Sequence, residues 1–286
     1  MATINWFPGH MKKTKREIQD NLKLVDAVIE IRDARIPRSS ANPDIDKLCA
    51  GKPRLILLNK SDLTEAKVTK DWINTLSSET VKVLEVNCLK GQGLQQIKPA
   101  LLELLKEKHD RAKAKGLVKF MMRVMVVGVP NCGKSTFINK MARNNIAKTG
   151  DRAGVTKSKQ WIKTSFDMEM LDTPGVLWPK FEDQDVALNL AFCRAIKDEI
   201  LDVETLALRL IGKLMEIEPE KLKARYKLEE LGDRDIETMD MIGRKRGFIM
   251  GNKELDYTRI ATTVLNEFRD GKIGKITLEV PEDIKK

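Results

Sequence analysis

The sequence predicts an α/β fold in which a doubly wound, mostly parallel sheet is followed by a smaller, mainly helical domain. Three observations predict this fold. Short apolar runs alternate with helix-compatible segments over the first part of the chain. Polar motifs follow directly after these runs, where ligands bind in parallel sheets. From about residue 184 the β-branched runs become rare and helix-periodic segments dominate, so we expect one domain over 1–183 and a second over 184–286.

The composition limits the classes of protein to which this chain can belong. Of its 286 residues, 42% are hydrophobic and 33% are charged, which is typical of a soluble globular protein. The formal net charge of +10 favours a polyanionic partner, RNA or DNA rather than a nucleotide; a merely soluble basic protein is the alternative. No apolar stretch reaches membrane-spanning length, and the four cysteines form no metal-type pair. We therefore expect a cytoplasmic, monomeric protein with reduced thiols and no membrane partner.

The elements can be placed in chain order from their periodicity. The first helix carries Ile18, Leu22 and Val25 on one face. Its early turns are basic, and positive charge near a helix N-terminus opposes the helix dipole. These basic residues therefore indicate contact with a partner, or else a solvated charged face. Strands are expected at 27–31, 54–58, 82–86, 124–127, 160–164 and 168–171, the last two as a hairpin. Helices are expected at 43–49, 65–75, 94–108, 136–143, 203–226 and 257–268, with a basic link at 111–119.

The segment 128–135 (Gly-Val-Pro-Asn-Cys-Gly-Lys-Ser) lies between an apolar run and a helical segment, the context of a phosphate-binding loop. Gly128 and Gly133 let the backbone curl so that N–H groups point at phosphate oxygens. Lys134 supplies a positive charge for the outer phosphates, and Ser135 supplies a hydroxyl ligand for Mg²⁺. An ordinary strand-to-helix turn is the alternative. The flanking segments favour a nucleoside-triphosphate site.

The segment 59–62 (Asn-Lys-Ser-Asp) indicates which base is bound. The Asp62 carboxylate can accept two hydrogen bonds from guanine, whereas adenine lacks this pair of donors. Asn59 is expected to bond neighbouring loops and the base, and the stem of Lys60 to cover the face of the base. An ordinary strand-to-helix turn is again the alternative. The predicted contacts of GTP or GDP are Asn59, Lys60, Ser61, Asp62, Asn87, Cys88, Asn131, Cys132, Gly133, Lys134, Ser135, Thr136 and Gly175.

Two loops are expected to form the metal site and the switches. Asp172 ends a strand and can hold Mg²⁺ through water, in a site with the hydroxyls of Ser135 and Thr156. A plain loop threonine is the alternative for Thr156. The Gly175 N–H can contact the γ-phosphate, so that its loop senses hydrolysis.

Two positions depart from the commonest GTPase pattern. Val176 stands where a water-orienting glutamine is common, and a valine cannot polarise water, so the isolated chain should hydrolyse GTP slowly. In a subset of GTPases, an asparagine placed as Asn131 helps to bind K⁺, which does the work of an arginine finger. A turn-capping asparagine is the alternative.

The order of the motifs predicts a circular permutation. The guanine segment 59–62 precedes the phosphate loop, whereas in ordinary GTPases it follows by about a hundred residues. The same sheet forms if the old termini are joined, and the link 111–119 would be that join. The fold class is therefore a circularly permuted P-loop GTPase domain followed by a helical domain. Its switch runs directly into the second domain, so loss of the γ-phosphate would reorient that domain.

The chain resembles the ribosome biogenesis GTPase A family of circularly permuted bacterial GTPases over nearly its whole length. The segments that carry the resemblance are 6–11, 33–37, 59–62, 128–135, 172–175 and 177–183. It implies a cytoplasmic GTPase that acts late in assembly of the large (50S) ribosomal subunit, binds the subunit precursor and its rRNA, and is stimulated by the particle and by K⁺. It also implies a catalytic role for His10, in addition to the catalytic roles predicted for Lys134 and Asn131. An RNA contact and a structural turn residue are the alternatives for His10.

Other readings remain beside this one. In the first, an RNA-binding assembly factor uses GTP as a conformational lock, and hydrolysis is incidental. In the second, a P-loop kinase acts on a small molecule, which the guanine segment disfavours. The loop 87–89 (Asn-Cys-Leu) departs from the Ser-Ala-Lys form of many GTPases, but its backbone supplies most of the contacts. For RNA, Arg244, Lys245 and Arg246 are expected contacts, or else a solvated charge cluster.

Overall fold

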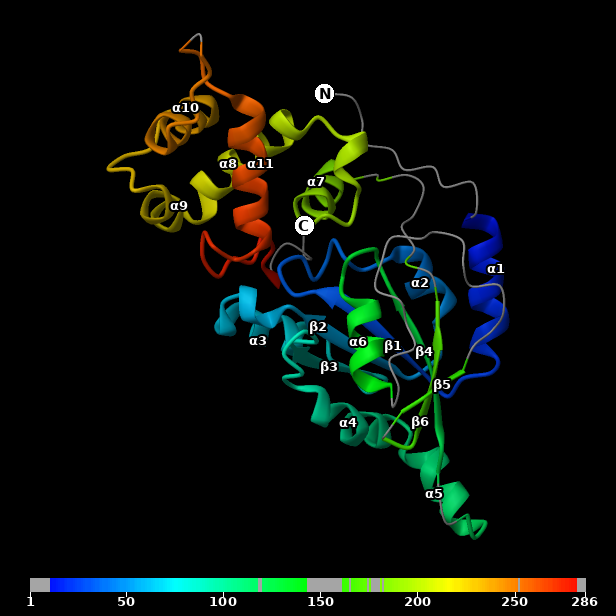
Figure 1. Cartoon of the computed structure of the whole chain (residues 1–286). Helices are drawn as coiled ribbons and strands as arrows, with labels where there is room; N and C mark the ends of the chain where they lie inside the picture. The colour runs from blue at the N-terminus through cyan, green and yellow to red at the C-terminus, as the bar shows by residue number, and fades with distance from the viewer. Residues whose placement is uncertain are drawn as a thin grey trace.

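An open six-stranded sheet forms the centre of the molecule (Figure 1). The computed structural model describes residues 11–117, 120–142, 161–164, 166–173, 175, 181, 183–251 and 253–281. The strand order is β3-β2-β1-β4-β6-β5. Neighbouring strands are parallel except for the antiparallel pair β5 and β6. The strands are β1 (Ala27–Asp33), β2 (Arg54–Asn59), β3 (Val81–Val86), β4 (Met122–Gly128), β5 (Trp161–Lys163) and β6 (Met168–Asp172).

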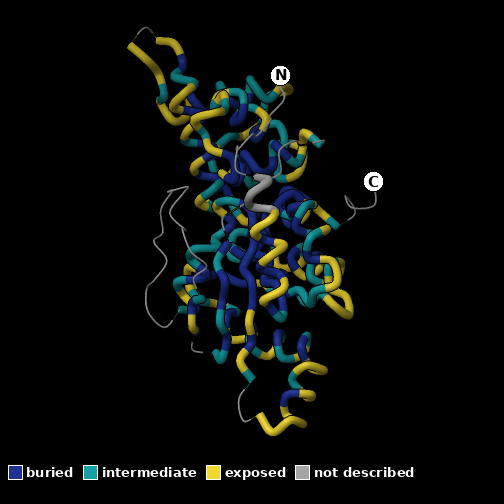
Figure 2. Tube along the Cα trace, turned by 90° about the vertical axis from the view of Figure 1, so that its right-hand side faces the viewer, coloured by how far each residue is buried: buried dark blue, intermediate teal, exposed yellow. Residues whose placement is uncertain are grey.

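Helices cover both faces of the sheet, which is why its central strands read as nearly continuous apolar runs. One face packs on α1, α2 and α3, and the other packs on α4 and α6. Figure 2 shows the strands as a buried layer between these helices. The bounds are α1 (Met11–Leu22), α2 (Pro43–Leu48), α3 (Ala66–Leu76), α4 (Ile97–Leu104), α5 (Lys106–Ala114) and α6 (Lys134–Met141).

Five α-helices among the described residues after 183 lie above the carboxyl ends of the strands (Figure 1). They are α7 (Gln184–Phe192), α8 (Val203–Ile217), α9 (Pro219–Tyr226), α10 (Asp235–Arg246) and α11 (Tyr257–Arg269). Helix α8 packs against each of the other four. Their apolar side chains belong to the same continuous core as the sheet. None of the helices among the described residues is long and apolar enough to cross a membrane.

The expected strands are all present, and the fold class is confirmed, but two expected helices are each divided. The stretch 94–108 is broken at Leu105, after which α5 continues to Ala114 and takes up half of the expected basic link. The stretch 203–226 is broken at Glu218. Pro219 lacks an N–H for the preceding turn, so it begins α9 as a first-turn residue instead.

The run 276–280 belongs to no strand, and it returns the chain to the part of the molecule that contains the sheet. The backbone N–H of Ile276 donates to the Leu63 carbonyl at 2.9 Å, and that of Leu278 donates to the Arg35 carbonyl at 2.9 Å. The indole of Trp72 donates to the Glu279 carbonyl at 3.1 Å. The end of the helical part is therefore fastened to the loops that follow β1 and β2.

Candidate nucleotide-binding site

The phosphate loop joins β4 to α6 at the middle of the sheet, and two of its glycines are required by close contacts. A Cβ at Gly128 would lie 2.6 Å from the Ile31 carbonyl oxygen and 2.8 Å from the Cys132 Sγ. Gly133 has φ +102°, and a Cβ there would collide with the Asn59 amide. Helix α6 begins directly at Lys134, so its free N–H groups face the loop.

Asn59 ties the phosphate loop to the loop after β3. Its Nδ2 donates to the Cys132 carbonyl at 2.8 Å, and its Oδ1 accepts from the Cys88 N–H at 2.9 Å. The Ser61 hydroxyl donates to the Val86 carbonyl at 3.1 Å, which adds a second link to the same loop. The Asp62 carboxylate lies at the open edge of this junction, one-third exposed and 3.5 Å from the Lys90 ammonium. Three segments that are distant in sequence thus meet where the sequence predicted the base.

Lys60 crosses the phosphate loop. Its residue adopts the left-handed conformation with φ 63°. Its ammonium donates to the Asn131 carbonyl at 2.9 Å and to the Asp33 carboxylate at 2.8 Å. The stem is therefore stretched beside the loop with its charge already paired.

Lys134 and Asp172 form the polar centre of the site. The Lys134 ammonium lies 2.7 Å from an Asp172 oxygen; Lys134 begins α6, directly after the phosphate loop, and Asp172 ends the neighbouring strand β6. The Thr173 hydroxyl donates to the Val126 carbonyl at 2.6 Å, which fixes the start of the loop that contains Gly175. A Cβ at Gly175 would lie 3.3 Å from Pro130, so this loop passes close to the phosphate loop.

The oxygen donors at this point suit Mg²⁺. Ser135 lies on the first turn of α6, and Asp172 offers a partly exposed carboxylate next to Lys134 of the same turn. Among the described residues no group of three His, Cys, Asp or Glu side chains could hold a metal ion. Mg²⁺ would therefore share its ligands between these residues and phosphate oxygens, as it does in nucleotide enzymes.

Asn131 points toward the helical part. Its Nδ2 donates to the Arg194 carbonyl at 2.7 Å, in the connection that follows α7. Both residues have positive φ angles, 58° and 64°. This contact joins the phosphate loop directly to the second part of the chain.

Some predicted positions lie outside the described residues. They are His10, Thr156 and Val176, together with the segment 150–156 around Thr156. The structure brings together the other predicted positions at the carboxyl ends of β2, β3, β4 and β6. Their assignment to GTP stays a prediction.

One feature of the site was missed. Asp33 and Arg35 form a buried ion pair beside Lys60, although the sequence indicated them only through the family resemblance. The signal was present as alternating charges at the end of an apolar strand, where unpaired charges are costly. Cys88 and Cys132 lie inside the loops as neutral thiols, since burial raises the pKa of Cys132 to about 11 and that of Cys88 to about 12.

Comparisons with known proteins agree with this geometry. Residues 123–234 match a family described as "50S ribosome-binding GTPase", and this match begins in β4, downstream of the guanine segment. "Ribosome biogenesis GTPase A" of Bacillus cereus is 49% identical over 280 residues, which cover 98% of this chain and 95% of that protein. The chain belongs to the ribosome biogenesis GTPase A family.

More distant members of the family also match over nearly the whole length of the chain. The Thermotoga maritima protein of that name is 31% identical over 281 residues, which cover 98% of this chain and 96% of that protein. Two solved structures, "Crystal structure of GNP-bound YlqF from T. maritima" and a GDP-bound YlqF, are 30% and 29% identical with TM-scores of 0.65. Each covers 94% of this chain, and the chain covers 99% and 100% of them.

Family membership confirms three predictions. The chain is a GTPase of ribosome biogenesis, it binds guanine nucleotides, and its fold is a circularly permuted GTPase. The sheet shows how the permutation works. Strand β4 with the phosphate loop lies between β1 and β6, so the guanine loops after β2 and β3 reach the same edge although they come first in the chain.

Proposed function

We propose that this GTPase acts late in assembly of the large (50S) ribosomal subunit. It binds the subunit precursor and its rRNA, and the ribosomal particle stimulates its GTP turnover. The observation that carries this proposal is the match over nearly the whole length, both parts included, to proteins named for ribosome biogenesis. A bovine relative at 33% identity, named "Mitochondrial ribosome-associated GTPase 1", supports the ribosomal partner. We place its action in the cytoplasm, as a monomer.

The mechanism divides the work among a few residues. Asp62 reads guanine, while the loop backbone and Lys134 neutralise the phosphates. Ser135, Thr156 and Asp172 would hold Mg²⁺, which would supply charge stabilisation to the transferred phosphoryl group. These residues bind and orient GTP but supply no group that polarises water, so turnover waits for a partner.

The partner-dependent step involves the N-terminal segment and a monovalent ion. We propose that His10 helps to position the attacking water once the particle is bound. Asn131 would hold K⁺, using its amide oxygen while the amide nitrogen stays bonded to the Arg194 carbonyl. Turnover of Asn131→Ala should lose the difference in rate between K⁺ and Na⁺, and an undiminished difference would exclude the role.

The rRNA contacts are proposed for the domain 184–286 and for the basic first helix. Of the expected contacts in α10, Arg246 is already engaged, 3.4 Å from Glu267 and over the ring of Tyr226. Arg244 and Lys245 remain exposed at the end of that helix. They are the residues of that cluster that suit phosphate groups.

The deciding experiment is GTP hydrolysis with and without purified large-subunit particles. We expect a slow rate for the chain alone and a large increase with particles. An RNA-binding factor in which GTP is only a conformational lock would show nucleotide-dependent binding to the particles without that increase. Absence of stimulation would therefore refute the first proposal and favour the second.

A further inference from the structure

Asp33 and Arg35 form a buried charge cluster that the nucleotide chemistry described above does not use. They lie at the carboxyl end of β1 and just beyond it, and each is 2% exposed. We propose that Asp33 is a positioning residue for guanine-nucleotide binding, which holds Lys60 across the phosphate loop while Arg35 fixes the same carboxylate against helix α11.

The contacts of Asp33 account for both of its oxygens. One oxygen accepts from the Lys60 ammonium at 2.8 Å and from Arg35 Nη2 at 2.8 Å, and the other accepts from Arg35 Nε at 3.0 Å. Burial by itself would raise the pKa of Asp33, but the charges of Arg35 and Lys60 outweigh it and hold the pKa well below its usual range. The carboxylate is therefore a fixed anion.

Lys60 is the link from this anion to the nucleotide site. An ammonium group has three N–H donors, and two of them are used by Asp33 and by the Asn131 carbonyl of the phosphate loop. A free lysine stem has many rotamers, and ordering it when the nucleotide binds costs affinity by a factor of about ten. Asp33 orders this stem in advance.

Arg35 is the link from the same anion to the helical part. Its Nη1 donates to the Arg269 carbonyl at 3.3 Å, and its guanidinium lies 5.2 Å from the centre of the Phe268 ring. Arg269 in turn donates to the carbonyls of Ala191 and Phe192 at the end of α7. The carboxyl ends of α7 and α11 are thus connected, through Arg269 and Arg35, to the Asp33 carboxylate that positions Lys60.

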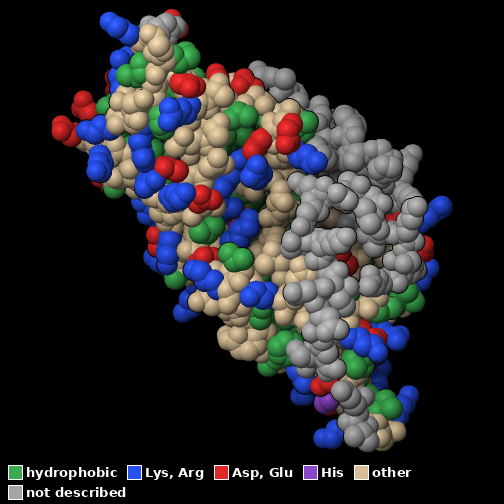
Figure 3. All heavy atoms as spheres, in the orientation of Figure 1, with side chains coloured by type: hydrophobic (Ala, Val, Ile, Leu, Met, Phe, Trp, Pro, Cys, Tyr) green, Lys and Arg blue, Asp and Glu red, His purple; other side chains and the backbone are tan. Residues whose placement is uncertain are grey.

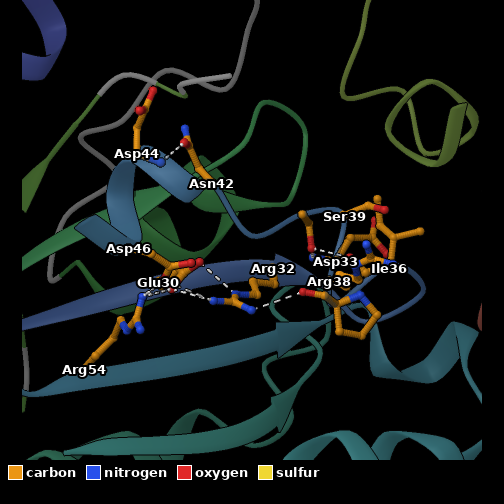
Figure 4. Close-up of polar contacts among 12 residues, drawn as sticks. Glu30, Arg32, Asp33, Ile36, Arg38, Ser39, Asn42, Asp44, Asp46 and Arg54 are labelled. Carbon is orange, nitrogen blue, oxygen red and sulfur yellow. Dashed lines mark hydrogen bonds and ion pairs between the residues drawn. The ribbon is translucent and has the colours of Figure 1, made fainter. Parts of the chain in front are cut away.

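A second cluster on the same strand provides a matched control. Glu30 and Arg32 are 1% and 4% exposed, and their ion pair has an N–O distance of 2.7 Å. Figure 4 shows this pair joined to Arg54 of β2 and to Asp46 of α2. None of the contacts described for these four side chains reaches a nucleotide loop. The Glu30–Arg32 pair therefore matches the Asp33–Arg35 pair in chemistry and burial, but it does not contact Lys60.

The experiment compares Asp33→Asn with Glu30→Gln. Titration with a fluorescent GDP should show about tenfold weaker binding in Asp33→Asn and unchanged binding in Glu30→Gln, while both lose thermal stability. Lys60→Met should weaken binding about tenfold, and the double variant Asp33→Asn/Lys60→Met should be no weaker than Lys60→Met alone. A merely structural role for Asp33 predicts additive losses.

Two results would overturn the proposal. One is equal loss of GDP affinity in Asp33→Asn and Glu30→Gln, and the other is additivity in the double variant. If Asp33→Asn does not fold, Arg35→Lys decides, because it keeps the charge but loses the paired N–H donors that fix the carboxylate. About threefold weaker GDP binding is expected there, and unchanged affinity would refute the link to α11.

Discussion

The two parts of the chain differ in the sign of their charge. Residues 1–183 hold 33 Lys and Arg against 21 Asp and Glu, whereas residues 184–286 hold 19 against 21. The whole net charge of +10 therefore comes from the GTPase part. A composition averaged over the chain indicates a polyanionic partner but does not indicate which part attracts it. The excess of positive charge therefore lies on the part that carries the nucleotide site.

Some basic side chains of the molecule are held in ion pairs, and others are exposed without one. In the helical part, Arg225 and Arg246 both bond Glu267, and Arg269 pairs with Asp198. In the GTPase part, Lys106, Lys113 and Lys115 are exposed on and after α5 and have no ion-pair partner among the described residues. Figure 3 shows Lys and Arg side chains around this end of the molecule, opposite the helical part. These three exposed lysines thus differ from the paired basic side chains that both parts contain.

The largest expected effect concerns nucleotide binding, which is a property of the GTPase part alone. Lys134→Ala removes the ammonium at the phosphate loop and should weaken GTP binding about 100-fold, since losing one partner of a buried charged contact costs about 3 kcal/mol. Equilibrium titration with a fluorescent GTP analogue checks it. Lys140→Ala, on the exposed side of the same helix, is the control and should bind normally. Equal affinities would remove Lys134 from the site.

An intermediate effect tests the charge difference directly. Arg244→Gln/Lys245→Gln in α10, where phosphate contacts are proposed, should lower the salt dependence of binding to large-subunit particles by a slope of about 1 to 2. Lys113→Gln/Lys115→Gln, which removes the same charge from the GTPase part, should lower it less. Binding is measured over a range of KCl concentrations. A larger drop for the Lys113/Lys115 pair would assign the phosphate contacts to the GTPase part.

The smallest effect concerns a property that the parts share. Burial raises the pKa of Cys132 to about 11 and that of Cys193 to about 12, so both thiols stay protonated at pH 8. At a pKa of about 11, roughly one thiol in a thousand is ionised at that pH. Alkylation by iodoacetamide should be slow in the folded chain and should quicken only as the pH rises toward these values. Rapid labelling of folded Cys132 at pH 8 would contradict the burial.

The sequence predicts the local features of this molecule well. The phosphate loop was identifiable because its glycines and lysine are adjacent in the chain, and the strands were identifiable because both of their faces are apolar. The break between α4 and α5 at Leu105 could not be predicted, because no proline or glycine marks it. The link from Arg35 to Arg269, and the hydrogen bonds of the Glu279 carboxylate with the Arg38 and Ser39 N–H groups, join residues more than two hundred positions apart. Periodicity carries no information about such pairs.

The hydrogen bond from Asn131 to the Arg194 carbonyl is a direct contact through which a change in the phosphate loop can reach the helical part. The donor belongs to the loop that surrounds the phosphates, and the acceptor follows α7. No intervening residue separates them. Any ligand that turns the Asn131 side chain removes a contact of the helical part in the same movement, so a signal between the parts can cross the boundary in one step.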